Sequence, residues 1–211
     1  MKRWYIIEGN IGSGKSTVVD ALSKDLRIET IQEPVDVWES IKDDDGKSLL
    51  DMYYQDPKRF CYLFQTITFK TRMQSLDFEQ QKDIRVSERS IMTDKNIFMK
   101  CLDEMGYMSA VERNSYYIWY DWLQAKMNRR PDAIIYIRAD PETCLKRICH
   151  RNRTGESNIS LDYLQTLHNK HEEWLNSIGS GADSVPVYII DNPLEMDKSE
   201  LVKRVKDIVI A

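Results

Sequence analysis

The sequence predicts an α/β fold in which a five-stranded parallel sheet lies between two layers of helices. Five short apolar runs rich in β-forming residues alternate with helical stretches, an order that favours parallel pairing in an open, doubly wound sheet. The runs are nearly continuous rather than alternating, which is typical of strands that helices cover on both faces. No repeat or interdomain linker interrupts the pattern, so residues 1–211 are predicted to form a single domain. The predicted strands are residues 4–7, 28–32, 84–87, 133–137 and 185–190.

The first predicted strand leads directly into a motif that indicates phosphate binding. Residues 9–17 fit the pattern G-x-x-x-x-G-K-[ST], in which backbone N–H groups surround phosphate oxygens at the positive end of a helix. Lys15 is expected to reach the β- and γ-phosphates, and the Ser16 hydroxyl to lie on Mg²⁺. The helix predicted over residues 17–26 carries an apolar stripe of Val18, Val19, Leu22 and Leu26. These features indicate a P-loop NTPase-like protein that binds a nucleoside triphosphate through Gly9, Asn10, Ile11, Gly12, Ser13, Gly14, Lys15, Ser16 and Thr17.

Charged residues follow the later strands, at the edge of the sheet where open parallel folds bind their ligands. Glu33, after the second strand, could accept the proton of an attacking hydroxyl, although a solvated loop glutamate would give the same pattern. Glu88, after the third strand, is placed to hold Mg²⁺ directly or through water. Arg89 beside it could pair with Glu33, with a phosphate or with the substrate oxygen. Asp191 follows the fifth strand, and we assign it to the nucleotide-binding edge.

Three arginines near residue 150 predict a lid over the phosphates. Arg147 and Arg151 are four residues apart on a helical pattern that begins near Pro141, so they share one face. With Arg153 they suit the negative charge that spreads over the oxygens of a transferred phosphoryl group. A solvated helix face could carry the same charges. Beside a phosphate loop, however, they indicate an arginine-rich lid over about residues 147–157.

Composition narrows the classes of function. The chain is 42% hydrophobic and 30% charged, as in a soluble globular protein, and no stretch approaches the ~18 apolar residues that cross a bilayer. A net charge of −4 argues against a surface that coats nucleic acid. The four cysteines show neither C-x-x-C spacing nor metal-ligand spacing with the histidines. We therefore expect buried free thiols in a reducing compartment and a cytoplasmic protein.

Five motifs follow one another almost from end to end of the chain. They are the phosphate loop, Glu33-Pro34-Val35 with Trp38, Phe64-Gln65 followed by Arg72, Glu88-Arg89-Ser90 with Asp94 and Phe98, and the arginine lid that ends in Glu156. In this order and at these spacings they resemble the deoxynucleoside kinase family, of the deoxycytidine, deoxyguanosine and deoxyadenosine kinase type. Such an ordered set is far more specific than a phosphate loop alone.

The resemblance implies a role for each matched residue. Glu33 would be the general base for the 5′-hydroxyl of a deoxynucleoside, and Arg89 its partner near the reacting oxygens. Gln65 would read the base edge through its amide, beside a charged pair of Arg72 and Asp94. The sugar 3′-hydroxyl would be held by Tyr54 and Glu156, and the base would be lined by Trp38, Phe64 and Phe98.

The resemblance also implies the reaction and the assembly. The reaction would be Mg²⁺–ATP-dependent phosphorylation of the 5′-hydroxyl, which serves nucleotide salvage. Because family members that favour thymidine tend to lack the arginine/aspartate pair, Arg72 and Asp94 point to deoxycytidine or a purine deoxynucleoside. The family is dimeric through a helical interface. An aromatic helix could form such a homodimer contact, or simply pack in the core, through Tyr116, Tyr117, Trp119, Tyr120 and Trp122.

Two other functions are compatible with a phosphate loop. A nucleoside monophosphate kinase of the thymidylate kinase type shares the fold, the loop and the lid. Its acceptor phosphate is already nucleophilic, however, and calls for a cation where Glu33 stands. A GTP-dependent switch would carry an N-K-x-D motif, and residues 94–96 read Asp-Lys-Asn, which is the wrong order. The sequence therefore predicts a deoxynucleoside kinase.

Overall fold

The computed structural model describes residues 1–127, 129–153, 155–178 and 185–211, so residue 154 of the predicted lid lies outside the described residues. Five strands form one sheet in the order β2-β3-β1-β4-β5, and every neighbouring pair is parallel. The predicted five-stranded parallel sheet is confirmed. The strands are β1 (Arg3–Glu8), β2 (Ile28–Ile31), β3 (Ile84–Glu88), β4 (Ala133–Arg138) and β5 (Val187–Asp191).

The strands differ in how completely the helices cover them. β1, β3 and β4, in the middle of the sheet, are buried along nearly their whole length. In β5, at one edge, Tyr188 is 46% exposed and Ile189 is 43% exposed. The expectation that all five strands are covered on both faces is wrong for β5, because the helix layers cover the centre of the sheet more completely than its edge.

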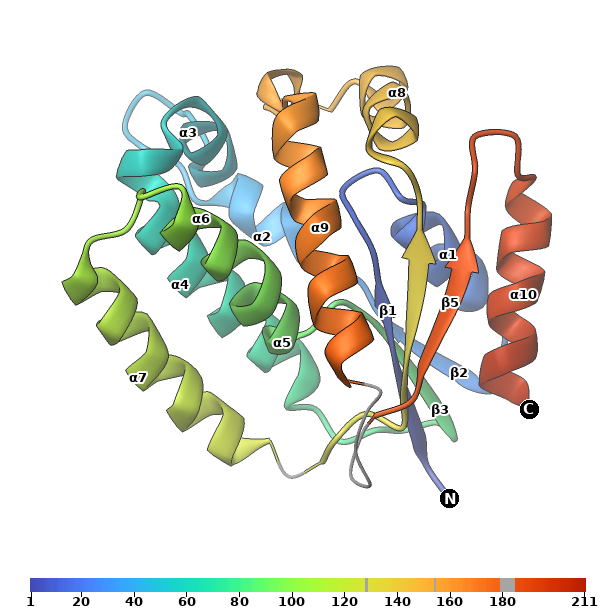
Figure 1. Ribbon diagram of the computed structural model, residues 1–211. Helices are drawn as coiled ribbons and strands as arrows, with labels where there is room; N and C mark the ends of the chain where they lie inside the picture. The colour runs from blue at the N-terminus through green and yellow to red at the C-terminus, as the bar shows by residue number, and fades with distance from the viewer. Residues whose placement is uncertain (128, 154, 179–184) are drawn as a thin grey trace.

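The helices form a layer on each face of the sheet. They are α1 (Lys15–Leu22), α2 (Val35–Ser40), α3 (Leu49–Gln55), α4 (Pro57–Leu76), α5 (Ile91–Thr93), the π-helical turn η1 (Asp94–Met99), α6 (Lys100–Glu104), α7 (Ala110–Lys126), α8 (Pro141–Arg151), the 3₁₀ turn η2 (Glu156–Asn158), α9 (Leu161–Ile178) and α10 (Lys198–Ile210). Figure 1 shows α1 and α10 on one face, and α9 with α4 to α7 on the other. This confirms the three-layer α/β/α architecture. Within the described ranges, no helix combines the length and the apolar character that crossing a membrane requires.

Apolar side chains hold each layer against the sheet. On one face, Val18 and Leu22 of α1 pack with Val205 of α10 over the strands. On the other face, Leu167 and Trp174 of α9 pack against the strands. Because both faces of the central strands are buried, their carboxyl ends are fixed relative to the helices that carry the site.

The first helix is shorter than predicted. α1 ends at Leu22, and Leu26 is 90% exposed, so its place in the apolar stripe is wrong. A turn centred on Asp25 replaces the last helical residues. The Asp25 carboxylate accepts from the Arg27 backbone N–H at 3.0 Å, and the Asp25 carbonyl accepts from the Ile28 N–H at 3.0 Å. These bonds direct the chain into β2 instead of continuing the helix.

The segment after β3 positions two of the predicted site residues, Asp94 and Phe98. The Ser90 hydroxyl accepts from the backbone N–H of Met92, and the Thr93 hydroxyl accepts from that of Ser90, so α5 is capped reciprocally. The chain then continues as helix through the π-helical turn η1, which starts at Asp94. Turns of this kind occur often at functional sites.

All four cysteines are free thiols. Cys61, Cys101 and Cys144 are buried, as expected. Cys149 is exposed, so the expectation of burial is wrong for this residue. It is next to Ile148, whose side chain is on the buried face of α8, and a step of one residue around a helix moves a side chain by about 100°.

Candidate active site

The loop of residues 9–17 joins β1 to α1 in a conformation that requires glycine at Gly12. Its φ is +78°, and a Cβ there would lie 2.6 Å from the Cys144 carbonyl oxygen. Lys15 is buried, and its ammonium donates to the Asn10 carbonyl inside the loop at 2.7 Å. Burial lowers the pKa of Lys15 to about 8. Lys15 is the first residue of α1, so its ammonium lies near the N-terminal end of this helix, where phosphate oxygens are attracted.

Ser16 and Glu88 lie together beside the loop, which fits a magnesium site. The Ser16 hydroxyl donates to Glu88 Oε1 at 2.9 Å, and Glu88 is 5% exposed at the end of β3. Hydroxyl and carboxylate oxygens are ligands that Mg²⁺ accepts, together with waters and substrate phosphates. In the described part of the chain, no group of three or more His, Cys, Asp or Glu residues forms a metal site. A metal bound here would therefore depend on these two side chains and the nucleotide.

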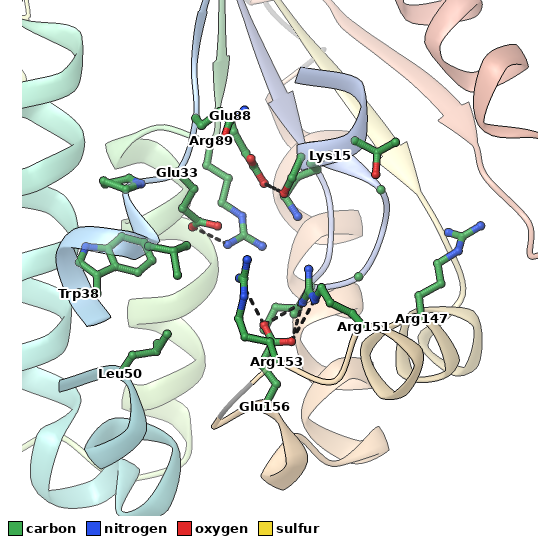
Figure 2. A pocket seen from close by; sticks show the side chains of 18 of the residues that line it. Lys15, Glu33, Trp38, Leu50, Glu88, Arg89, Arg147, Arg151, Arg153 and Glu156 are labelled. Carbon is green, nitrogen blue, oxygen red and sulfur yellow. Dashed lines mark hydrogen bonds and ion pairs between the residues drawn. The ribbon is translucent and has the colours of Figure 1, made fainter. Parts of the chain in front are cut away.

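Glu33, just after β2, lines the cavity, and Figure 2 shows its carboxylate beside the Arg89 guanidinium. Arg89 Nη1 donates to Glu33 Oε1 at 2.9 Å, and Arg72 Nη2 donates to the same oxygen at 2.5 Å. Burial favours the neutral acid, but the two guanidiniums outweigh it and hold the pKa of Glu33 well below its usual range. Glu33 is therefore an ionised carboxylate at the cavity wall, not a solvated loop residue.

Arg89 connects Glu33 to the phosphate loop. Its φ is +61°, a left-handed conformation that is uncommon for residues other than glycine and clusters at functional sites. Its backbone N–H donates to the Ile7 carbonyl at 3.0 Å, and Nη2 donates to the Gly9 carbonyl at 3.2 Å. Its guanidinium lies 4.8 Å from the centre of the Phe98 ring. The side chain is thus held between β1, the loop and the aromatic wall.

Arg72 and Asp94 form the charged pair that the family resemblance implies. Arg72, on α4, donates from Nε to the Asp94 carboxylate at 3.0 Å, and both side chains are buried. Burial raises the pKa of Asp94 to about 6, although the charge of Arg72 opposes this. Gln65 Oε1 and Arg72 Nη1 are buried without a hydrogen-bond partner among the described residues, and both side chains line the cavity. A ligand could satisfy this acceptor and this donor.

These residues surround one large cavity with a volume of about 1170 Å³. Pockets for one drug-sized molecule are roughly 300–1,000 Å³, so this space can hold a nucleoside together with a nucleotide. Trp38 and Phe64 form part of its wall and meet edge to face, with ring centres 5.4 Å apart. The lining includes every predicted site residue except Gly9, Asn10, Ser13 and Asp191.

The three lid arginines separate into two groups. Arg151 forms a two-pronged pair with Glu156, with contacts of 2.7 and 3.1 Å, and Arg153 lies 3.6 Å from the same carboxylate. Arg147 instead donates to the Pro193 carbonyl at 2.9 Å and points away from Glu156 (Figure 2). Arg147 is one helical turn before Arg151 on α8, and at this place it lies beside the loop that follows β5. All three arginines line the same cavity, although Arg147 and the other two have different partners.

After β5, Asn192, and not the predicted Asp191, contacts the phosphate loop. It is 3% exposed, and its Nδ2 donates to the Ser13 carbonyl in the phosphate loop at 2.8 Å. Its own oxygens accept longer contacts of 3.4 Å from Arg147. Asp191 accepts from Arg138 at 2.6 Å, outside the cavity lining. β5 ends at Asp191, and Asn192 is the first residue beyond the strand, where its side chain reaches the loop.

Glu8, the last residue of β1, was not singled out from the sequence. It is fully buried, and the Thr93 hydroxyl donates to one of its carboxylate oxygens. Burial raises the pKa of Glu8 to about 7. The sequence does place Glu8 directly after the apolar pair Ile6-Ile7, at the end of the first strand. The phosphate-binding pattern begins at Gly9, so it does not specify this residue.

Comparison with known proteins agrees with this geometry. The family model for deoxynucleoside kinases matches residues 5–210. The chain is 38% identical to the probable deoxycytidine kinase of fowlpox virus over 187 residues, covering 88% of this chain and 77% of that relative. It is 36% identical to deoxycytidine kinase of Homo sapiens over 230 aligned positions, covering 95% of this chain and 88% of the relative.

A further relative is named for another base. The chain is 33% identical to the mitochondrial thymidine kinase 2 of Homo sapiens over 205 residues, covering 97% of this chain and 76% of that relative. None of these relatives is a monophosphate kinase, so the thymidylate kinase alternative is not favoured. With a family model that spans almost its whole length, the chain belongs to the deoxynucleoside kinase family.

Proposed function

We propose that this protein transfers the γ-phosphoryl group of ATP to the 5′-hydroxyl of a deoxynucleoside, for nucleotide salvage, with residues 1–211 acting as one domain. The observation that carries the proposal is the Glu33 carboxylate, which is held by Arg72 and Arg89 and faces the same cavity as the phosphate loop. A weakly acidic hydroxyl needs an acceptor for its proton. A phosphate acceptor, in contrast, would be repelled by a carboxylate at this place.

Each side chain then has a part in the transfer. Glu33 accepts the proton of the 5′-hydroxyl while that oxygen bonds to the γ-phosphorus and the bond to the β-phosphate oxygen breaks, which releases ADP. Lys15 and the loop N–H groups hold the β- and γ-phosphates. Arg147, Arg151 and Arg153, which line the cavity, supply positive charge to the transferred group. Mg²⁺, held by Ser16 and Glu88, would neutralise phosphate oxygens when bound.

The base-reading side chains favour deoxycytidine or a purine deoxynucleoside over thymidine. Gln65 offers an amide to the cavity, and Arg72 and Asp94 form the charged pair that thymidine-preferring members tend to lack. Sequence identity does not choose the base, because relatives named for deoxycytidine and for thymidine are similarly close. Tyr54 and Glu156, both in the lining, would hold the 3′-hydroxyl.

We further propose a homodimer that acts in the cytoplasm. α7 exposes Ile118, Trp119 and Trp122, whereas Tyr116 and Tyr120 on its other side are buried. Large exposed apolar patches mark interaction sites, and the family resemblance indicates a helical interface. Four free cysteines fit a reducing compartment.

The proposed function is tested by measuring ADP release from Mg²⁺–ATP with the four deoxynucleosides and the four deoxynucleoside monophosphates as acceptors. We expect turnover of deoxycytidine or a purine deoxynucleoside, with the monophosphates inert. Turnover of a monophosphate alone would mean that the acceptor site has been misidentified, although the loop and the lid would still be assigned correctly.

A substitution of Glu33 tests its role directly. Glu33→Gln removes the proton acceptor but keeps the size of the side chain, so kcat should fall by on the order of 10²–10⁴ with little change in ATP affinity. Steady-state kinetics and ATP titration measure the two effects. Glu104→Gln, at an exposed carboxylate on α6, is the matched control. A near-normal kcat for Glu33→Gln would remove Glu33 from the mechanism.

A further inference from the structure

Arg72 lies between the two ends of the acceptor site. Its side chain is 4% exposed. Nε donates to Asp94 and Nη2 donates to Glu33, while Nη1 is buried without a hydrogen-bond partner among the described residues. One guanidinium therefore contacts both the carboxylate beside the base edge and the carboxylate that receives the hydroxyl proton.

The guanidinium can transmit a displacement because it is planar and rigid. Two of its three nitrogens are fixed by carboxylates, and its central carbon lies 5.3 Å from the centre of the Trp38 ring, which limits tilting. A base atom that bonds to Nη1 would engage the third nitrogen. Any shift of the Arg72 group toward or away from the base then moves Nη2 relative to Glu33 as well.

Arg89 does not duplicate this contact. Arg89 reaches Glu33 from the end of β3 and also donates to the Gly9 carbonyl, so its position follows the phosphate loop. Arg72 reaches the same oxygen of Glu33 from α4, on the side of the base-reading residues. The two arginines thus hold one carboxylate oxygen from the donor side and from the base side.

We propose that Arg72 is a positioning residue for Glu33, so that recognition of the base is coupled to the group that accepts the hydroxyl proton. This inference rests on the proposed function. It requires Arg72 to contribute to phosphoryl transfer even onto a substrate that has no base. A residue that only reads the base would contribute nothing to that reaction.

The experiment therefore uses 1,2-dideoxyribose, which keeps the 3′- and 5′-hydroxyls of the nucleoside but lacks the base. Removing Arg72 alone would leave Asp94 as a buried carboxylate without a cation, which can prevent folding. The variant is therefore Arg72→Gln combined with Asp94→Asn, and its reference is Asp94→Asn alone. Transfer from radiolabelled ATP is followed with enzyme in excess. Arg59→Gln, an exposed arginine on the same helix, is the control for the substitution.

We expect the double variant to phosphorylate the abasic sugar at least about 10-fold more slowly than Asp94→Asn, because a hydrogen bond to a charged group is typically worth a factor of about 10 to 100. The Arg59→Gln variant should match the wild type. Equal rates for Asp94→Asn and the double variant would overturn the proposal and leave Arg72 as a base-reading residue only.

The pH profile of kcat on the preferred deoxynucleoside is the second readout. The charges of Arg89, Arg72 and Lys15 lower the pKa of Glu33, and Asp94 and Tyr54 are titratable groups that also interact with it. Loss of the Arg72 charge should move the acid limb of the profile to higher pH in the double variant relative to Asp94→Asn, and an unchanged limb contradicts the proposal. Failure of the proposed function is distinguishable, because the wild type would then phosphorylate no deoxynucleoside.

Discussion

At the scale of single residues, Glu8 shows how a buried carboxyl makes stability depend on pH. Burial raises its pKa from 4.5 to about 7, and one of its oxygens has no hydrogen-bond partner among the described residues. Between these two values the folded state binds more protons at this site than the unfolded state. The contribution of Glu8 to the free energy of unfolding therefore falls as pH rises from about 4.5 to 7.

Replacing Glu8 by glutamine should remove this dependence. Glu8→Gln keeps an acceptor for the Thr93 hydroxyl but cannot ionise. The free energy of unfolding of the variant minus that of the wild type should therefore increase by on the order of 1–3 kcal/mol between pH 5 and pH 8. Urea denaturation at the two pH values measures the change. Glu79→Gln, at an exposed carboxyl, should show no such trend. A Glu8→Gln effect that is the same at both pH values would mean that Glu8 does not titrate in this range.

At the scale of elements, the end of β5 is joined to the phosphate loop and to α8 through Asn192. Its side chain donates to the Ser13 carbonyl, and its oxygens receive Arg147. The backbone N–H of Asn192 donates to the Arg138 carbonyl at 2.7 Å, which anchors the residue to β4. The contact therefore fixes the phosphate loop, on the side of the cavity that is proposed to bind ATP.

Loss of this connection should weaken ATP binding selectively. Asn192→Ala removes one buried hydrogen bond to the loop, so KM for ATP should rise about 3- to 10-fold, while KM for the deoxynucleoside changes little. Steady-state kinetics with each substrate varied in turn separates the two effects. Asn169→Ala, at an exposed position on α9, is the control. Equal rises in both KM values would show general disruption of the fold instead of a role on the donor side.

At the scale of the whole molecule, α7 divides its aromatic residues between the core and the surface. Tyr116 packs edge to face on Phe69 of α4 at 5.2 Å and is fully buried. Trp119 and Trp122 are 49% and 53% exposed and contact each other edge to face. The two explanations that the sequence left open for this helix therefore apply to different faces of it. Core packing accounts for one face, and the dimer proposal concerns the other.

Charges on the outer face of α7 should disrupt the proposed dimer. With Trp119→Glu and Trp122→Glu together, the sedimentation coefficient should fall from that of a dimer to that of a monomer, because the charges would have to be desolvated at the interface. Leu26→Glu, at an exposed apolar residue after α1, should leave the sedimentation coefficient unchanged. A wild-type protein that sediments as a monomer, or a double variant that stays dimeric, would contradict the assignment of this face.

The sequence determined the features that contiguous residues create. The phosphate loop between β1 and α1, the five parallel strands and the charged residues at the strand ends are all recognisable because their patterns are local. Arg72 and Asp94 form the pair that the family resemblance implied. Except for this pair, the signal is a short spacing or a hydrophobic run, which a single chain segment contains in full.

Only the tertiary structure decided which distant side chains meet. It brought Arg72 to Glu33 across 39 positions of the chain, turned Arg147 toward Pro193, and placed Asn192 against the loop where Asp191 was expected. A step of one residue changes direction by about 100° on a helix and about 180° on a strand. Small differences in where an element ends therefore decide which side chain enters the site, and packing against the other layers sets those ends.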